Sequence, residues 1–149
     1  MLNVKGRSTG ETDLRRSDRE LTSKVDIDDI LNRARVCHLG LCLDGIPYVV
    51  PLNYGHADIL RSNDRVSFVI YLDERLKTAE IACKWSTGYK SVMGEGRASL
   101  IEKPQAKEEA LRIIMRHYSK DEFTFDPLLV DKVVIIKVKI SSITCKQSI

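Results

Sequence analysis

Residues 35–55, RVCHLGLCLDGIPYVVPLNYG, carry the pattern that decides the predicted fold. Two short apolar runs, 35–43 and 46–55, are separated by Asp44-Gly45, and this dipeptide is the strongest short-range signal of a β-hairpin. Pro51 lies inside the second run and cannot donate a hydrogen bond to a neighbouring strand. We therefore expect an antiparallel hairpin whose second strand lies at an edge, has a bulge or switches partners. This suits the wall of a small barrel better than the middle of a flat sheet.

The rest of the chain adds further strands and few helices. Alternating or dense apolar residues predict strands over 65–72, 89–102 and 131–141. Gly94 and Gly96 lie in the middle of the second of these strands, where paired glycines favour a bend or a bulge. The strands follow one another closely along the chain, so most of them are expected to pair antiparallel.

Apolar residues at helical spacing predict a helix over 23–33 with a capping box at its start, and a second helix that begins at Pro104. Residues 57–63 predict a short helical turn. Residues 73–88 are mixed and polar and predict a lid-like connection with one helical turn. This order of elements favours an α+β fold built on a mostly antiparallel barrel over a parallel, doubly wound sheet.

Length and composition indicate one ordinary globular domain. The chain has 149 residues, of which 43% are hydrophobic and 30% charged. Its net charge of +3 is too small to indicate a nucleic-acid partner. No apolar run is long enough to cross a membrane, and the start has no secretory signal. We expect a flexible basic arm over 1–20, a single domain over 21–149, no membrane partner and a cytoplasmic location.

The four cysteines are expected to be free thiols, two or three of them buried. Cys37 and Cys42 lie in one predicted strand and are separated by roughly 16 Å, at about 3.3 Å per residue. A disulfide needs Cα atoms within about 7 Å. No CxxC pair is present, so a zinc site is not expected and no metal ligands are assigned.

No sequence motif assigns a catalytic residue. The chain contains no P-loop, HExxH or GxSxG, and no GxGxxG follows a strand. Cys37 and His38 are adjacent in a strand and point to opposite faces, which argues against a Cys–His nucleophile. His38 is expected in the sheet wall with its imidazole hydrogen-bonded. His56 follows a strand end, where binding residues often lie, and is a candidate cofactor contact.

Several stretches occur together in one order: LRRSDRELTS (14–23), the hairpin, YKSVMGEGRASLIEKP (89–104) and LRIIMRHYS (111–119). With this order the chain resembles the FMN-binding split-barrel proteins related to pyridoxamine 5′-phosphate oxidase. Within them it is most similar to the nitroimidazole-resistance (Nim) group, over about residues 14–146. The resemblance implies an α+β split β-barrel and a homodimer with FMN held between the subunits.

The same resemblance implies which residues contact the flavin. The end of the second hairpin strand would line the isoalloxazine ring with Val50, Pro51, Leu52, Asn53 and Tyr54, and Lys90 and Ser91 match a second flavin-facing segment. A flat ring suits an apolar wall with a few fixed polar groups. The implied activity is that of an FMN-dependent oxidoreductase acting on small acceptors such as 5-nitroimidazole-type nitroaromatics. Candidate proton donors are Tyr54, His56 and Tyr89.

The chain departs from the family pattern after Gly55. Family members have another strand there, which ends in a His-Ser-Ala-like turn, and then a Gly- and Lys-containing loop that holds the FMN phosphate. Here Gly55 is followed directly by His56-Ala57-Asp58. Since phosphate binding needs backbone N–H groups, Arg or Lys, the candidate substitutes are Arg61, Arg65 and Lys77.

Two other functions remain open. The chain could be a non-catalytic split-barrel protein that is cofactor-free or binds haem, as some relatives of this fold do. A haem needs an axial ligand, and the available side chains are those of His38, His56 and Cys37. Nucleic-acid binding through the basic arm is disfavoured, because no aromatic residues interleave with its few charges.

Overall fold

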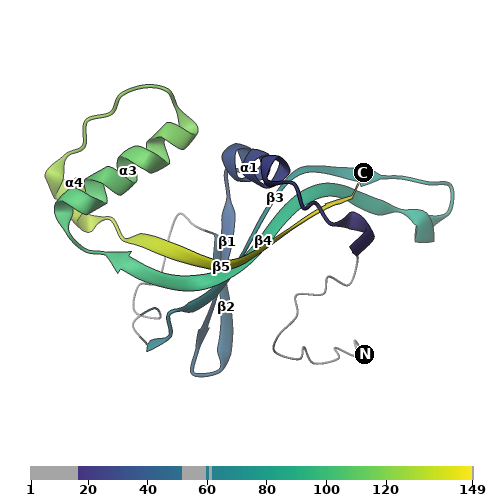
Figure 1. Cartoon of the computed structure of the whole chain (residues 1–149), viewed down its shortest axis with the longest axis horizontal. Helices are drawn as coiled ribbons and strands as arrows, with labels where there is room; N and C mark the ends of the chain where they lie inside the picture. Colours follow the sequence, from purple (N-terminus) through teal and green to yellow (C-terminus); the bar gives the residue numbers. More distant parts are fainter. Residues whose placement is uncertain (1–16, 52–59, 61, 149) are drawn as a thin grey trace.

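The computed structural model describes residues 17–51, 60 and 62–148. In these residues, five antiparallel strands form one sheet in the order β2-β1-β3-β4-β5. The strands are β1 (Cys37–Leu43), β2 (Ile46–Pro51), β3 (Arg65–Lys77), β4 (Ser86–Ile101) and β5 (Ile135–Ser148). The sheet is strongly twisted, so the β1–β2 hairpin crosses the long strands (Figure 1). The α+β class with antiparallel pairing is confirmed, and the described strands form an open sheet.

The β1–β2 hairpin forms as predicted. Leu43 pairs with Ile46 across the two-residue turn, in which Asp44 has φ 49° and Gly45 has φ 82°. Two positive φ values give the turn the twist that matches the flanking strands. Among the described residues β2 pairs only with β1, so Pro51 lies on an edge strand, where a missing N–H leaves the ladder intact.

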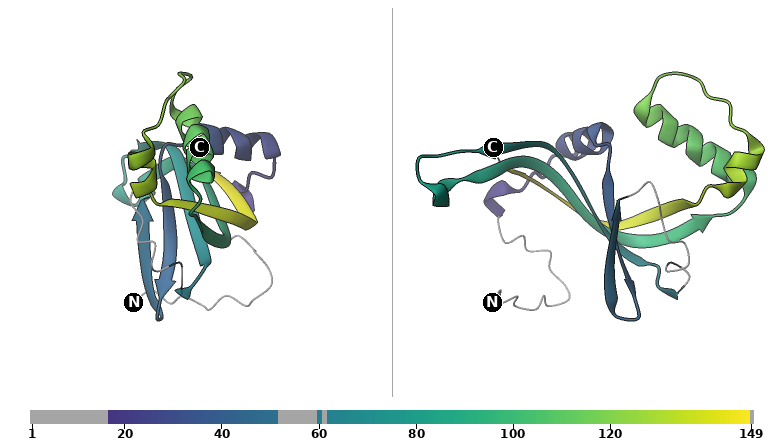
Figure 2. Two further views of the ribbon diagram at one scale, coloured as in Figure 1. Left: turned by 90° about the vertical axis from the view of Figure 1, so that its left-hand side faces the viewer. Right: turned by 180° about the vertical axis from the view of Figure 1, so that it is seen from behind.

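The lid-like connection predicted over 73–88 is wrong for most of its length, where strands form instead, but its one helical turn is present. β3 continues to Lys77, β4 begins at Ser86, and a single 3-10 turn, η2 (Ala82–Lys84), lies between them. Lys77 pairs with Ser86, and the register shifts between Leu72 and Arg75. This outer part of the β3–β4 hairpin, called the arm below, projects beyond the rest of the sheet (Figure 2). Both of its faces meet water, which removes the alternation of apolar and polar residues that marks a strand.

The helices lie on one side of the sheet. Helix α1 (Lys24–Arg33) packs the fully buried Ile30 against the core, but Ser23 makes no side-chain cap bond, so the predicted capping box does not form. Helices α3 (Pro104–Tyr118) and α4 (Pro127–Lys132) lie at the end of the sheet opposite the arm (Figures 1 and 2). α3 was predicted from Pro104, whereas α4 was not. No residue of α3 is buried.

The core covers one face of the sheet. Val50, Leu39 and Phe68 are buried and paired in register across β2, β1 and β3, and paired residues of neighbouring strands share a face. Val92 and Cys145 extend this apolar layer across β4 and β5. The four cysteines are free, as expected, but only Cys145 is buried. The opposite face, called the open face below, carries none of this core.

The beginning of the described chain is attached to the last strand. The 3-10 turn η1 (Ser17–Arg19) is followed by a bridge between Glu20 and Lys146, and the Leu21 N–H donates to the Cys145 carbonyl at 2.9 Å. Residues 1–16 of the predicted basic arm lie outside the described residues. None of the helices in the described part of the chain is long and apolar enough to span a membrane.

Candidate functional site

A row of side chains crosses the open face where the resemblance places the flavin. Pro51, His38, Val69 and Met93 are paired in register on β2, β1, β3 and β4. Pro51 is exposed and Met93 is 43% exposed, so this row presents apolar surface to solvent. Since neighbouring residues of a strand alternate between faces, the Val50 side chain lies on the other side, in the core.

Ser91 shares the open face with this row. It lies two residues before Met93 on β4 and is paired with Tyr71 on β3 and Lys146 on β5. Its side chain is buried, whereas Lys90 is half-buried and alternates to the core side. The structure therefore brings Pro51 and Ser91, from the two predicted flavin segments, to one face. The other predicted contacts lie outside the described residues: Leu52, Asn53, Tyr54 and His56.

His38 lies between the two segments, and its Nδ1 has no hydrogen bond among the described residues. Its ring stacks on Tyr71, with centroids 5.4 Å apart and ring planes 8° apart. Nδ1 is buried and has no hydrogen-bond partner in the described structure, so the expectation of a hydrogen-bonded imidazole is wrong. The residues paired with His38 are Pro51 and Val69, whose side chains carry no polar atom. Because orphaned buried N–H groups are rare, this favours a proton on Nε2 and an unprotonated Nδ1.

Three basic residues form a second row on the open face, four residues along β3 from Val69. Arg65, Arg97 and Lys139 are paired in register on β3, β4 and β5, and we call them the basic row. Arg97 Nη1 bonds both carboxylate oxygens of Asp64, at 2.7 and 2.9 Å, which raises the pKa of the guanidinium.

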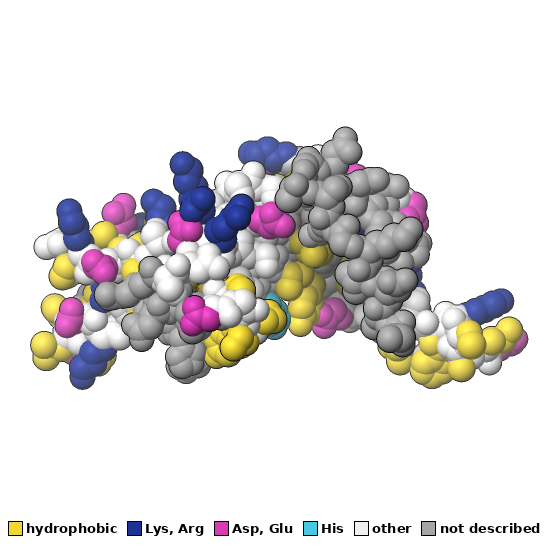
Figure 3. Space-filling view, turned by 90° about the horizontal axis from the view of Figure 1, so that it is seen from below, with side chains coloured by type: hydrophobic (Ala, Val, Ile, Leu, Met, Phe, Trp, Pro, Cys, Tyr) yellow, Lys and Arg dark blue, Asp and Glu magenta, His cyan; other side chains and the backbone are white. Residues whose placement is uncertain are grey.

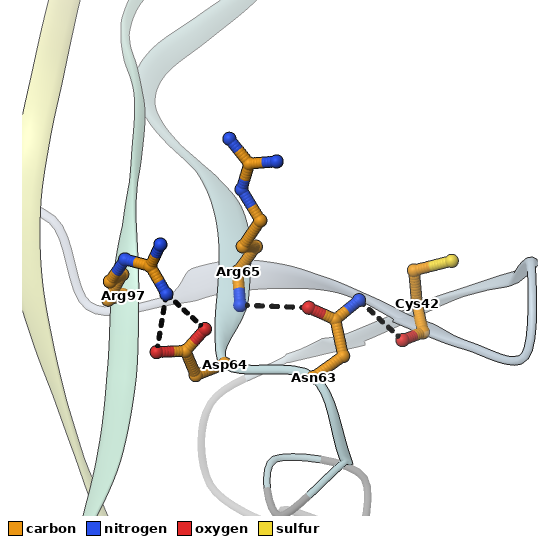
Figure 4. Close-up of polar contacts among 5 residues, drawn as sticks. All are labelled: Cys42, Asn63, Asp64, Arg65 and Arg97. Carbon is orange, nitrogen blue, oxygen red and sulfur yellow. Dashed lines mark hydrogen bonds and ion pairs between the residues drawn. The ribbon is translucent and has the colours of Figure 1, made fainter.

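The loop before β3 holds this end of the sheet in place. Asn63 accepts from the Arg65 backbone N–H at 3.1 Å and donates to the Cys42 carbonyl at 3.0 Å (Figure 4). The Arg65 guanidinium points away from the Asp64–Arg97 pair, and no bond is drawn to it (Figure 4). Asn63 therefore fixes the backbone from which Arg65 projects.

The basic row lines a groove of about 740 Å³. Glu95 is the acid among the described lining residues, so the groove has three cationic side chains and one carboxylate. The remaining lining residues come mainly from the β1–β2 hairpin and from β5: Gly40, Leu41, Cys42, Pro47, Tyr48, Val49, Val66, Ser67, Gly96, Ile140 and Ser141. Of the three predicted phosphate ligands, Arg65 lines this groove, Lys77 lies on the arm, and Arg61 lies outside the described residues.

A second, apolar cleft of about 480 Å³ lies between the end of α1, the start of β5 and helix α3. His117 Nε2 contacts the Ala34 carbonyl at 2.6 Å, and the Tyr118 hydroxyl donates to the Arg35 carbonyl at 2.9 Å. Cys37 also lines the cleft, and burial raises the pKa of its thiol to about 11. A thiol with this pKa stays protonated near neutral pH, so Cys37 is a poor nucleophile and a poor haem ligand.

Within the described ranges, no group of three or more His, Cys, Asp or Glu side chains could hold a metal ion. Two candidate sites for an organic ligand are therefore considered. One is the open-face row that contains His38, whose Nδ1 has no hydrogen bond in the described structure, and the other is the groove lined by the basic row. Sequence reasoning named Arg65 as a phosphate ligand but missed its neighbours Arg97 and Lys139, and it also missed the lack of a hydrogen-bond partner at His38 Nδ1. Each depends on which residues face one another across strands, and residue types alone do not carry that information.

Comparison with known proteins identifies the family. A family model described as pyridoxamine 5′-phosphate oxidase matches residues 23–147. The chain belongs to the pyridoxamine 5′-phosphate oxidase family. A solved structure of a candidate 5-nitroimidazole antibiotic resistance protein from Bacteroides thetaiotaomicron is similar to this family member, with 31% identity, 86% coverage of each chain and a TM-score of 0.71. No curated protein matches the chain.

More distant structures share the fold of this pyridoxamine 5′-phosphate oxidase family member. The flavocytochrome Anf3 from Azotobacter vinelandii is 19% identical over 91% of this chain and 72% of its own, with a TM-score of 0.75. The FAD and heme binding protein from Mycobacterium smegmatis is 16% identical over 87% and 73%, with a TM-score of 0.70. At these identities the likeness concerns the fold, and it confirms the predicted split-barrel class.

Proposed function

We propose that this protein binds FMN on the open face of its sheet and passes electrons to small acceptors, with nitroaromatic compounds as the first class to test. The observation that carries the proposal is the row of Pro51, His38 and Met93, which offers exposed apolar surface around one polar side chain without a partner. Ligand sites for flat rings combine these two features. The similarity to the candidate 5-nitroimidazole resistance protein supports the choice of acceptor.

The side chains of the open face suit a flavin ring. Pro51 and Met93 supply apolar contact, and the Nε2–H of His38 is available to donate to a ring oxygen or nitrogen. Tyr71 stacks on the imidazole and keeps it in one orientation. FMN, when bound, supplies the transfer of electrons from a reduced donor to the acceptor. The protein binds the ring, orients it and controls the access of water.

A homodimer is part of the proposal. Val49, Tyr71 and Met93 are 64%, 42% and 43% exposed on the open face. Together with Pro51 they leave a large apolar surface on a single subunit, and such surfaces in proteins are commonly binding sites. A second copy of the chain covering this face would enclose the ring and exclude water from it. Analytical ultracentrifugation of the purified protein tests this part, and a monomer at micromolar concentration would contradict it.

Haem is the second candidate cofactor, and one observation favours it. His38 is a side chain of a type that ligates haem iron, and it has no hydrogen bond in the described structure. The raised pKa of Cys37 argues against that residue as a thiolate ligand. A haem would give a Soret band, whereas FMN gives the two visible bands of an oxidised flavin, so one absorption spectrum separates the two cofactors.

The deciding experiment is the absorption spectrum of the purified protein, followed by identification of any cofactor released on denaturation and by titration of the apoprotein with FMN. We expect flavin bands, release of FMN and, after reduction, bleaching of a nitroaromatic acceptor. His38→Leu should weaken FMN binding, while Val25→Ala, on an exposed site of α1, should leave it unchanged. A colourless protein that does not take up added FMN would rule out the proposal.

A further inference from the structure

The basic row places three like charges directly opposite one another. Arg65 is paired with Arg97, and Arg97 with Lys139, so the three side chains leave the same face of adjacent strands. Directly opposed residues on antiparallel strands have Cβ atoms roughly 5 Å apart, and like charges at that spacing repel. A sheet held together by its hydrophobic core tolerates such a row, but the row does not contribute to folding.

Among the described residues, Arg97 is the member of the row that forms an ion pair, and Glu95 is a further carboxylate that lines the same groove. Asp64 binds Arg97 through both carboxylate oxygens, while Arg65 and Lys139 form no ion pair within the described residues. The Arg65 guanidinium projects away from the Asp64–Arg97 pair (Figure 4). Asn63 does not contact that guanidinium, since it engages the Arg65 backbone instead. Two unpaired cations therefore remain beside a third that is already neutralised.

These cations line a groove that has the size and the polar groups for an anion. The groove of about 740 Å³ includes the Ser67 side chain beside Arg65, and Gly96 lies next to Arg97. The Ser141 hydroxyl donates to the Glu95 carbonyl at 3.0 Å, so it is already used. A guanidinium fork and an ammonium close to a hydroxyl are the groups that recognise a phosphate group.

The groove is also within reach of the proposed ring site. Arg65 lies four residues from Val69 on the same strand and the same face, so about 13 Å separates the two rows, at about 3.3 Å per residue. A flavin nucleotide joins its ring to its phosphate through a five-carbon chain. This chain is shorter than the separation of the two rows, so contact with both rows also uses the length of the Arg65 and Lys139 side chains. Both rows face the same side, so one nucleotide can contact both.

We infer that Arg65 and Lys139, with Arg97 held by Asp64, bind the phosphate group of the flavin nucleotide. They would take the role that the resemblance assigns to a phosphate-binding loop after Gly55. This inference rests on the proposed function for the identity of the nucleotide, but the phosphate site itself is defined by the groove and its charges.

The test compares FMN with riboflavin, which has the same ring and no phosphate. We expect the wild-type protein to bind FMN at least tenfold more tightly than riboflavin, with FMN affinity falling as salt increases. Arg65→Gln and Lys139→Gln together should remove most of that preference and leave riboflavin binding unchanged. Lys137→Gln is the matched control, because Lys137 is exposed two residues away on β5 and lies outside the groove.

A second readout does not depend on flavin. Inorganic pyrophosphate should raise the melting temperature of the wild-type protein and of the Lys137→Gln variant, and should not raise that of the double variant. If pyrophosphate stabilises the wild type in this way while no flavin binds, the proposed function fails and the phosphate site stands for another phosphate-bearing ligand. If FMN and riboflavin bind equally and pyrophosphate has no effect, the proposed function stands and the inference is overturned.

Discussion

His38 and Tyr71 stack face to face on the open side of the sheet, with ring centroids 5.4 Å apart and planes 8° apart. The two residues come from neighbouring strands, and Tyr71 lies two positions beyond Val69, the residue paired with His38. The tyrosine ring therefore covers one side of the imidazole. The described residues give Nδ1 of His38 no hydrogen bond, so this stacking contact sets the orientation of the ring, and that orientation determines what Nε2 can reach.

Replacing His38 should have opposite effects on stability and on binding. His38→Leu removes a buried ring nitrogen that has no partner, so we expect the free energy of unfolding of the apoprotein to rise by about 1 kcal/mol. FMN affinity should fall about tenfold, which equals about 1.4 kcal/mol of lost binding. Urea denaturation and flavin fluorescence titration measure the two effects. The matched control is His117→Leu, which removes an imidazole that is hydrogen-bonded to the Ala34 carbonyl and should lower the free energy of unfolding. A lower free energy of unfolding in His38→Leu would contradict the prediction.

Helix α3 should unfold locally more easily than the sheet. None of its residues is buried, and its last turn is attached by the bonds of His117 and Tyr118 to the carbonyls of Ala34 and Arg35. Tyr118→Phe removes one of these bonds and should speed amide hydrogen exchange in α3, with a change in global stability of about 1 kcal/mol or less. Exchange measured by mass spectrometry checks this. Equal protection of α3 and β4 in the wild type would contradict it.

Gly94 should not tolerate a side chain. A Cβ atom there would meet the Phe68 ring, and it would lie 2.8 Å from the Ser142 carbonyl oxygen. Gly94→Ala should therefore lower the free energy of unfolding by about 1–3 kcal/mol, the usual range for overpacking. Ser99→Ala is the control, because Ser99 is exposed on the same strand. Urea denaturation of the two variants should separate them clearly, and similar midpoints would argue against close packing at Gly94.

The stability of the protein should decrease at alkaline pH partly because of Cys37. Burial raises the pKa of this thiol from 9.0 to about 11 in the folded protein. Between these values the unfolded chain loses the proton while the folded chain keeps it, so the free energy of unfolding falls as pH rises from 9 to 11. Cys37→Ser should flatten this part of the pH profile. Parallel profiles for the wild type and the variant would contradict the prediction.

Local sequence signals predicted the β1–β2 hairpin, but they did not predict the strands in the outer part of the β3–β4 hairpin, and the reason is physical. Asp44-Gly45 encodes its turn in two residues, because both must adopt positive φ. The strand from Arg65 was recognised while one of its sides faced the core, to Leu72. Beyond that point the residues meet water on both faces, and apolar side chains gather again at the outer end of the arm (Figure 3). Helix α4 was missed because six residues are too few for a helical period to be visible.

The candidate site was only partly accessible from the sequence. Pro51 and Ser91 came from the resemblance, and they share the open face in the structure. Arg65 was a predicted phosphate ligand, but the row that it forms could not be predicted. Arg97 and Lys139 are far from it along the chain and become its neighbours only through strand register. A shift of one residue in that register would move each side chain to the other face of the sheet.

The prolines of β2 also protect the molecule from uncontrolled growth into filaments. Pro47 and Pro51 are spaced by four residues, so both nitrogens point to the same side of an edge strand that pairs only with β1 among the described residues. Prolines on edge strands face away from the sheet and leave gaps in the row of N–H donors. A strand from another molecule that docks edge to edge needs that row. The β2 edge is therefore a poor template for amyloid-like stacking, even though the sheet is open.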